Sequence, residues 1–350
     1  MRFLELIRVF TLPLFPLYWI LVKLRNFLFE IGIFPQRSVN AKIISVGNIT
    51  VGGAGKTPMS IYMIKKMKEL NKSVAVLSRG YGRDSEGYLL VSDGKEILSK
   101  VNESGDEMYL TAIECECPAA VCEGRLEGAR KLIDTFHPEV IVLDDAFQHR
   151  WIKRDLDIVI FDQRFINHAN WLNRLALPTG SMRESFAALK RADCVIVNRK
   201  FSQKSENSEF EKCLSQKQLV FNSHYEMVDF IDVRNGKKYS SQVFQGQKSL
   251  AVCGIASPHS FFEALDSLTI SYENKLIFAD HKKYSESEVQ KIRKEFYDRN
   301  CYSVITTQKD AVKLMQFKED LDDIDIYYLK IDLVIDEEEK FNNYLNEKLF

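Results

Sequence analysis

One glycine-rich segment constrains the fold of this chain more than any other feature. Residues 50–57 read Thr-Val-Gly-Gly-Ala-Gly-Lys-Thr and match the phosphate-binding pattern G-x-x-x-x-G-K-[ST], except that Thr50 replaces the first glycine. The apolar residues 42–46 before it predict a buried strand, and residues 57–70 after it predict a helix. A strand, a glycine-rich turn and a helix in this order predict an α/β fold that binds phosphate groups.

The residues of this loop suit the phosphates of ATP. Gly52, Gly53 and Gly55 leave no Cβ atoms to block close approach of the backbone. We expect Lys56 to reach the β- and γ-phosphates and the Thr57 hydroxyl to bind Mg2+. The residues expected to surround the nucleotide are Thr50, Val51, Gly52, Gly53, Ala54, Gly55, Lys56 and Thr57.

Short apolar runs alternate with helical patterns along most of the chain. This alternation predicts a largely parallel sheet flanked by helices, of the P-loop NTPase type. Residues 200–218 are rich in Ser, Gln, Lys and Glu, which is typical of a surface crossing or a linker. The sequence thus predicts an apolar N-terminal interfacial helix in residues 1–36, a P-loop core in 37–220 and a smaller α/β domain in 221–350. Ten runs predict strands, at residues 42–46, 74–77, 118–121, 140–143, 158–161, 194–197, 250–253, 275–278, 303–306 and 326–329.

Charge and cysteine usage limit the classes of partner and compartment. The formal net charge is -1, so no overall field attracts a polyanion, and we expect no nucleic-acid partner. We infer no obligate protein partner either. The seven cysteines are scattered and odd in number, which favours a reducing compartment. Cys115, Cys117 and Cys122 lack paired Cys-x-x-Cys spacing, so we interpret them as small buried side chains rather than as metal ligands.

The N-terminal segment is apolar and aromatic. Its uncharged run, residues 9–22, is shorter than the ~18–20 residues that a membrane-spanning helix needs, and Pro13 and Pro16 would disturb a simple span. A signal peptide is a second alternative, although no convincing cleavage site follows. We favour a helix that lies at an anionic membrane surface, and a helix packed on the protein's own core is an equal competitor. The basic residues available for anionic lipid include Arg2, Arg8, Lys23 and Arg25.

Two adjacent carboxylates follow another predicted buried strand. Residues 140–143 read Val-Ile-Val-Leu, and Asp144 and Asp145 come next. Ligands bind at the carboxyl ends of strands in open α/β sheets, so either carboxylate could hold or orient Mg2+. Alone, the pair is an ordinary acidic turn, but beside a phosphate loop it predicts a metal site.

Several motifs in order resemble the tetraacyldisaccharide 4'-kinase family. They are residues 47–50 (Gly-Asn-Ile-Thr), 78–83 (Ser-Arg-Gly-Tyr-Gly-Arg), 105–107 (Gly-Asp-Glu), 144–150 (Asp-Asp-Ala-Phe-Gln-His-Arg), 278–284 (Phe-Ala-Asp-His-Lys-Lys-Tyr) and 306–314 (Thr-Thr-Gln-Lys-Asp-Ala-Val-Lys-Leu). The resemblance covers nearly the whole chain. Ala146, Lys282 and Gln308 depart from the usual Gly, His and Glu of the family, so we assign no role to them.

The resemblance implies an ATP- and Mg2+-dependent kinase of lipid A biosynthesis. The acceptor would be the 4'-hydroxyl of tetraacyldisaccharide 1-phosphate. The enzyme would be a peripheral protein at the cytoplasmic face of the inner membrane. The resemblance also implies Asp106 as the general base, His281 as its partner and Glu107 near the metal. The remaining side chains that suit phosphate or substrate are Arg79, Arg83, Arg125, Gln148, His149 and Arg150.

Two other functions fit parts of the sequence. A P-loop ATPase or GTPase acting on a membrane partner would share the loop and the Asp144–Asp145 pair, although no Asn-Lys-x-Asp guanine motif is evident. A non-catalytic, membrane-docked nucleotide-binding module would share the apolar N-terminus. Turnover that depends on an added lipid disaccharide would separate the kinase from both.

Overall fold

A computed structural model describes residues 8, 10–205, 210, 214 and 218–350. Within these residues the strands form one sheet in the order β11-β10-β12-β13-β8-β7-β6-β1-β5-β2-β4-β3, with β9 paired to β8. The strands are β1 (Lys42–Gly47), β2 (Val74–Ser78), β3 (Leu89–Asp93), β4 (Pro118–Val121), β5 (Val140–Asp144), β6 (Leu156–Asp162), β7 (Cys194–Asn198), β8 (Leu219–Asp232), β9 (Lys238–Tyr239), β10 (Ser249–Cys253), β11 (Tyr272–Ile277), β12 (Ser303–Thr307) and β13 (Ile326–Ile335).

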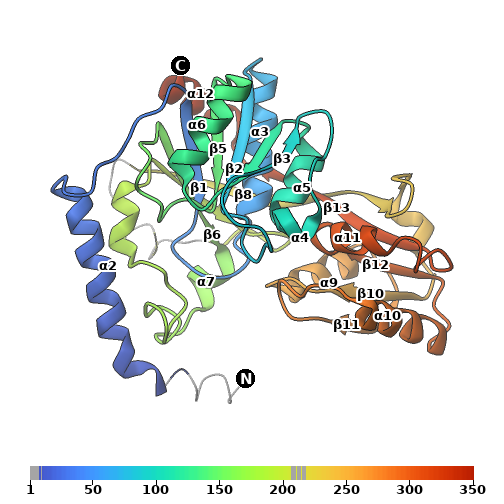
Figure 1. The fold of residues 1–350 in the computed structure, drawn as a ribbon. Coiled ribbons are helices and arrows are strands. Elements are labelled where there is room, and N and C mark those ends of the chain that lie inside the picture. The colour runs from blue at the N-terminus through green and yellow to red at the C-terminus, as the bar shows by residue number, and fades with distance from the viewer. Residues whose placement is uncertain (1–7, 9, 206–209, 211–213, 215–217) are drawn as a thin grey trace.

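Helices cover both faces of this sheet, and the molecule has two lobes (Figure 1). The large lobe holds β1–β7, α3–α7 and α12, and the small lobe holds β9–β12 and α9–α11. The α-helices are α2 (Phe15–Glu30), α3 (Lys56–Glu69), α4 (Val101–Ser104), α5 (Asp106–Cys115), α6 (Arg125–Phe136), α7 (Gln163–His168), α9 (Pro258–Ser267), α10 (Glu286–Asp298), α11 (Gln308–Leu314) and α12 (Glu338–Leu349); the 3-10 helices are η1 (Leu12–Leu14), η2 (Phe186–Arg191), η3 (Ser241–Phe244) and η4 (Met315–Phe317).

The large-lobe strands are apolar on both faces because each face is covered. Ile44 and Val142 pack with α3, α5 and α12, whereas their neighbours Ile43 and Ile141 pack with α6 on the opposite face. Strands buried on both sides read as continuous apolar runs, which is why the sequence reveals them. β1 pairs in parallel with β5 and β6, so their carboxyl ends meet at one edge of the sheet.

Two long strands carry the sheet from the large lobe into the small lobe. β8 pairs in parallel with β7 over Leu219–Ser223 and in antiparallel fashion with β13 as far as Asp232. The small lobe then adds β12, β10 and β11, all parallel to β13. Its sheet is covered by α9 on one face and by α10 and α11 on the other.

The end of the chain returns to the large lobe. On α12, Phe341, Leu345 and Leu349 are buried in the same core as Ile44 and Met59. The ring of Phe341 meets the ring of Phe221 edge to face, with centroids 4.9 Å apart. The small lobe is therefore an insertion between β8 and α12, and the division into residues 1–36, 37–220 and 221–350 stays a prediction.

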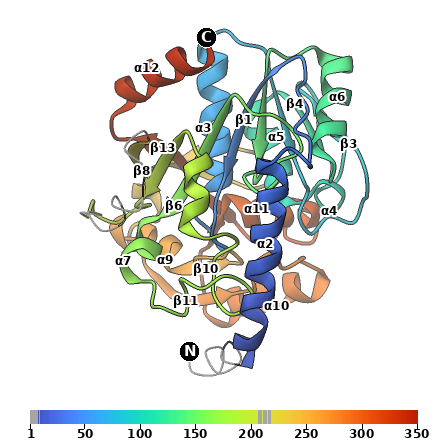
Figure 2. The same ribbon diagram turned by 90° about the vertical axis from the view of Figure 1, so that its left-hand side faces the viewer.

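The helix α2 lies along one side of the large lobe (Figures 1 and 2). Pro13 falls in η1 and Pro16 in the first turn of α2, where a proline is tolerated, so neither lies in the interior of the α-helix. Leu12–Glu30 is long and apolar enough, by length and composition, to cross a membrane. Phe29 is its one buried residue, so most of its apolar side chains do not cover the protein's own core.

The fold agrees with the predicted class. All ten predicted strands are present, and the predicted helix at residues 57–70 is α3. The sequence interpretation missed β3, β8 and β9. Cys115, Cys117 and Cys122 are buried, as predicted, whereas Arg2, Cys213 and most of the polar stretch 206–217 lie outside the described residues.

Candidate active site

The loop between β1 and α3 is fixed by its own backbone geometry and by neighbouring amides. Gly52 and Gly55 have φ angles of 107° and 103°, which disfavour residues with a Cβ. Thr50 is not among the residues with positive φ; its N–H donates to Asn48 Oδ1 at 3.0 Å, and its hydroxyl accepts from Asn48 Nδ2 at 2.7 Å. A glycine is therefore not required at position 50. Asn198 Nδ2 donates to the carbonyl of Ala54 at 3.1 Å and holds the loop from the other side.

Three charged side chains converge beside this loop. Lys56 Nζ lies 3.7 Å from Asp145 Oδ2, and a guanidinium nitrogen of Arg183 donates to Asp145 Oδ1 at 2.7 Å. Burial opposes ionisation of Asp145, but Lys56 and Arg183 outweigh it and lower the pKa of the carboxyl. Asp145 thus holds two cations at the place where the phosphates of a nucleotide would lie.

Asp144 carries the other carboxylate of the pair in a buried position. It is 1% exposed and accepts a hydrogen bond from the Ser60 hydroxyl at 2.8 Å. Burial, together with the charges of Glu107 and Asp145, raises the pKa of Asp144 far above its usual range. A divalent cation would relieve this repulsion.

These oxygens fit Mg2+ by their chemistry. In the part of the chain that the structure describes, no three His, Cys, Asp or Glu side chains are grouped so as to bind a metal by themselves. Mg2+ is usually held by one or two carboxylates with phosphates and water, so this donor set suits it. Thr57, Glu107 and Asp145 line the same cavity, and the buried Asp144 interacts electrostatically with Glu107 and Asp145.

A second ionic cluster joins the two lobes. Asp106 begins α5, where the helix dipole favours a carboxylate, and Oδ1 of Asp106 lies 3.5 Å from Nδ1 of His281. Nζ of Lys309 lies 3.7 Å from Asp106 Oδ2, 3.2 Å from Glu107 Oε1 and 3.4 Å from both ring nitrogens of His281. Burial opposes ionisation of Asp106, but His281, Lys309 and Lys313 outweigh it and lower the pKa of its carboxyl to about 2. The hydrogen bond to Asp106 raises the pKa of His281.

Local backbone structure presents this cluster. Gly105 precedes α5 with a φ of 82° and lies close to the carbonyl of Tyr81, so it turns the chain where Asp106 begins the helix. The Tyr81 ring in turn contacts the ring of His281 edge to face at 5.2 Å. In the small lobe, the fully buried Asp310 accepts from the N–H of Gly254 at 2.8 Å and fixes the start of α11, which carries Lys309.

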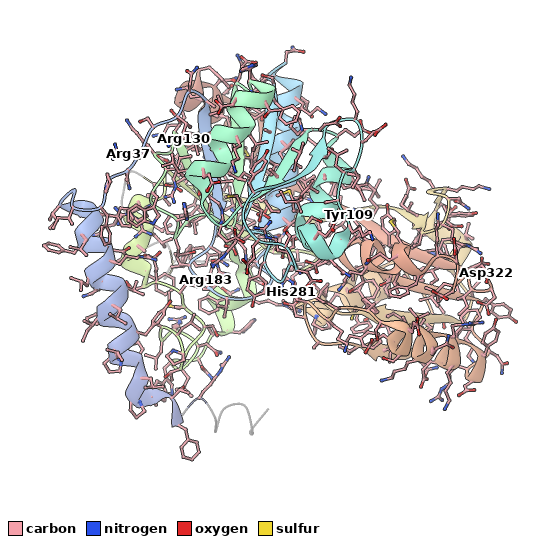
Figure 3. The ribbon with its side chains drawn as sticks, in the orientation of Figure 1. Arg37, Tyr109, Arg130, Arg183, His281 and Asp322 are labelled. Atoms are coloured by element: carbon pink, nitrogen blue, oxygen red, sulfur yellow. The ribbon has the colours of Figure 1, made fainter. Side chains whose placement is uncertain are left out.

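One cavity of about 500 Å³ connects the loop with this cluster. Its walls include residues 51–58, Glu107, Asp145 and Arg183 from the large lobe and Asp280, His281 and Lys309 from the small lobe. Figure 3 shows Arg183 and His281 near the middle of the molecule, between α2 and the small lobe. The cavity wall also includes apolar and aromatic side chains, namely Phe201, Tyr225, Phe261, Leu329 and Ile331.

Other candidate residues lie outside this cavity wall. Arg83 pairs with Glu123 at 2.6 Å, and Arg150 donates to the carbonyl of Asn26 at 3.1 Å. Burial of the His149 ring lowers its pKa to about 4, and the nearby positive charges of Arg125, Arg154 and Arg79 contribute to this shift. The candidates that do not line the cavity are Thr50, Arg79, Arg83, Asp106, Arg125, Asp144, Gln148, His149 and Arg150.

Sequence reasoning missed several residues of the site. Arg183 follows no recognised spacing and reaches Asp145 only through the fold. Lys309 stands inside the quoted 306–314 motif, so that motif was the available signal. The aromatic residues Tyr225, Phe261 and Phe201 of the cavity wall come from β8, which the sequence did not reveal, from α9 and from the loop after β7, respectively.

Comparisons with known proteins agree with this geometry. The family model described as tetraacyldisaccharide-1-P 4'-kinase matches residues 7–350. A tetraacyldisaccharide 4'-kinase of Halothermothrix orenii is 35% identical and covers 91% of this chain and 86% of its own length. One of Chlorobium phaeovibrioides is 34% identical and covers 96% of each chain. A crystal structure of LpxK from Aquifex aeolicus in complex with ATP has a TM-score of 0.80 and 27% identity, and covers 98% of this chain and 100% of that chain. The chain belongs to the tetraacyldisaccharide-1-P 4'-kinase family.

Proposed function

We propose that this chain transfers the γ-phosphate of ATP to the 4'-hydroxyl of tetraacyldisaccharide 1-phosphate in the cavity between its lobes. The acceptor oxygen forms a bond to the γ-phosphorus, the bond to the β-phosphate oxygen breaks, and ADP leaves. The hydroxyl proton passes to the Asp106–His281 pair. One observation carries the proposal: the phosphate loop of the large lobe and His281 and Lys309 of the small lobe line the same cavity, and both small-lobe side chains also contact Asp106 of α5.

The donor nucleotide is held by the large lobe. The loop at residues 50–57 surrounds the phosphates with backbone N–H groups, and Lys56 neutralises the charge that shifts to the leaving oxygen. Arg183 lies on the same side, 2.7 Å from Asp145, and is free to exchange this carboxylate for a phosphate oxygen. The aromatic side chains of Phe201 and Tyr225 in the cavity wall suit the base.

Mg2+ would complete this half of the site. Thr57, Glu107, Asp144 and Asp145 would hold it together with phosphate oxygens, because they supply the hard oxygen donors that Mg2+ prefers. When bound, the ion neutralises charge on the transferred phosphoryl group. The chain's own contribution is to keep Asp145 ionised through Lys56 and Arg183.

The acceptor side is supported by Asp106 of α5 together with His281 and Lys309 of the small lobe. With its pKa held near 2, Asp106 is ionised throughout the physiological range and orients an attacking hydroxyl through its charge. His281 contacts both Asp106 and Asp280 and shares the arriving proton, while Lys309 balances the negative charge of the cluster. Arg79, Arg125 and His149 are candidates for the acceptor's 1-phosphate, since three arginines surround His149.

The acceptor's acyl chains place the reaction at a membrane. Leu17, Leu21 and Leu24 of α2 are more than half exposed, which suits insertion among lipid chains. A groove of about 500 Å³ beside α2, lined by Trp19, Phe27 and residues 183–185, 187 and 188, offers an adjacent path for an acyl chain. We propose that α2 attaches the enzyme peripherally to the anionic cytoplasmic face of the inner membrane, and that residues 37–220 contain the P-loop core and residues 221–350 contain the smaller α/β domain.

Radiolabelled ATP and purified lipid acceptor test the proposal together. We expect the lipid to be labelled only when Mg2+ and acceptor are both present, and ADP to form in equal amount. A chain that releases free phosphate at the same rate with and without the acceptor would be an ATPase instead. A chain that binds ATP without either reaction would be a nucleotide-binding module.

A further inference from the structure

The helix α2 is turned so that polar side chains face the protein. The Tyr18 hydroxyl donates to the carbonyl of Arg183 at 3.1 Å, and Asn26 Nδ2 donates to Glu184 Oε2 at 2.7 Å. On the outward side, Leu21 and Leu24 are 55% and 51% exposed. These two side-chain hydrogen bonds of α2 thus go to two consecutive residues, Arg183 and Glu184.

Glu184 is a buried carboxylate with a full set of partners. Its side chain is 1% exposed; both oxygens accept from Arg191 at 3.1 Å, and Arg25 lies 3.4 Å away. An ionised carboxylate in such a position is tolerated only while its cations and donors stay in place. The carboxylate therefore ties α2, through Arg25 and Asn26, to the large lobe.

The segment that carries Glu184 also reaches the phosphate loop. The N–H of Val51 donates to the carbonyl of Ser181 at 2.8 Å, and the N–H of Arg183 donates to the carbonyl of Ile49 at 2.7 Å. The side chain of Arg183 then extends to Asp145 in the cavity. Residues 181–184 are thus held by the loop on one side and by α2 on the other.

We propose that Glu184 is a positioning residue, through which α2 sets the place of Arg183 and of the phosphate loop relative to the bilayer. This proposal rests on the proposed function, because it assumes that Arg183 binds a phosphate oxygen during phosphoryl transfer. Loss of the Glu184 contacts leaves the outward face of α2 unchanged but releases the segment that aims Arg183. Loss of these contacts should therefore lower kcat, whereas the affinities for the membrane and for ATP should not change.

Two conservative substitutions test the proposal. Glu184→Gln removes the charge and keeps the shape, and Tyr18→Phe removes one hydroxyl. Glu139→Gln and Tyr297→Phe are matched controls, because Glu139 pairs with Lys72 and Tyr297 with Asp323 away from the cavity. We measure kcat on bilayer acceptor, ATP affinity, and binding to phosphatidylethanolamine–phosphatidylglycerol vesicles.

We expect kcat to fall about tenfold for Glu184→Gln and about threefold for Tyr18→Phe, the scale of one or two lost hydrogen bonds. Vesicle binding, ATP affinity and both controls should stay within about twofold of the wild type. In an Arg183→Ala background, Glu184→Gln and Tyr18→Phe should have little further effect, since they act through Arg183.

Unchanged kcat in both variants, or losses that multiply with Arg183→Ala, would overturn the proposal. If Glu184→Gln does not fold, the same criteria apply to Tyr18→Phe, which leaves the buried charge intact. A wild-type chain that labels no lipid overturns the proposed function and this proposal with it. A normal wild-type rate with normal variants overturns this proposal alone.

Discussion

Asp106 and His281 meet across the two lobes and share their surroundings with Lys309. Each group changes the ionisation of the others: the hydrogen bond raises the pKa of His281, whereas His281 and Lys309 help to lower that of Asp106. The three side chains are therefore expected to act together in the reaction. The consequence at the residue scale is that single substitutions should not give independent effects.

The first prediction concerns this pair. Asp106→Asn and His281→Ala should each lower kcat by about 10²-fold or more, the scale of a positioned acid–base group. The double variant should be little worse than either single variant. Steady-state kinetics at saturating ATP and acceptor provide the measurement, and losses that multiply would show that the two residues act separately.

The second prediction concerns Lys56. Lys56→Ala should lower kcat by about 10²- to 10³-fold with the fold intact, because a fixed positive charge near the leaving oxygen is lost. Lys42→Ala is the matched control: Lys42 starts β1 at the other end of the strand and pairs with exposed Asp155. Near-normal turnover by a folded Lys56→Ala protein would remove the loop from the mechanism.

At the scale of elements, the sequence was most informative where strands are buried on both faces. β1, β5 and β7 are continuous apolar runs and were predicted almost to the residue. β8 was missed because polar residues such as His224 and Asp229 alternate along it, and because a linker-like stretch precedes it. Nor could the sequence state which face of α2 is turned inward, since that depends on partners such as Glu184.

The third prediction follows from the outward face of α2. Leu21→Glu with Leu24→Glu should weaken vesicle binding by about tenfold or more, because two leucine side chains no longer enter the apolar layer. ATP affinity should not change, since the loop lies elsewhere. Leu98→Glu, at an equally exposed leucine after β3, serves as the control in a vesicle co-sedimentation assay. Normal binding by the double variant would exclude α2 as the attachment site.

At the scale of the whole molecule, one sheet runs through both lobes. β8 and β13 pair along their length, so the small lobe is joined to the large lobe by two strands rather than by a flexible linker. The sequence could indicate two α/β regions but not this continuity, because strand order depends on pairings between distant segments. The pairing of Asp106 with His281 likewise came from family resemblance and not from spacing.

The fourth prediction tests the return of α12 to the large lobe. Phe341 is fully buried against Phe221 and Tyr62, so Phe341→Ala should lower the free energy of unfolding by about 3–5 kcal/mol. Phe350→Ala, at a side chain that is 56% exposed, should lower the free energy of unfolding much less. Urea denaturation measures both, and equal costs would show that α12 does not belong to this core.

The γ-phosphate of ATP should be transferred to the lipid disaccharide. The most direct measurement incubates the purified protein with radiolabelled ATP, Mg2+ and tetraacyldisaccharide 1-phosphate in vesicles, and then locates the label on the lipid by mass spectrometry of fragments. We expect one new phosphate monoester per ADP formed, on the 4'-hydroxyl of the disaccharide. Label at another hydroxyl, or free phosphate with an unlabelled lipid, would contradict it.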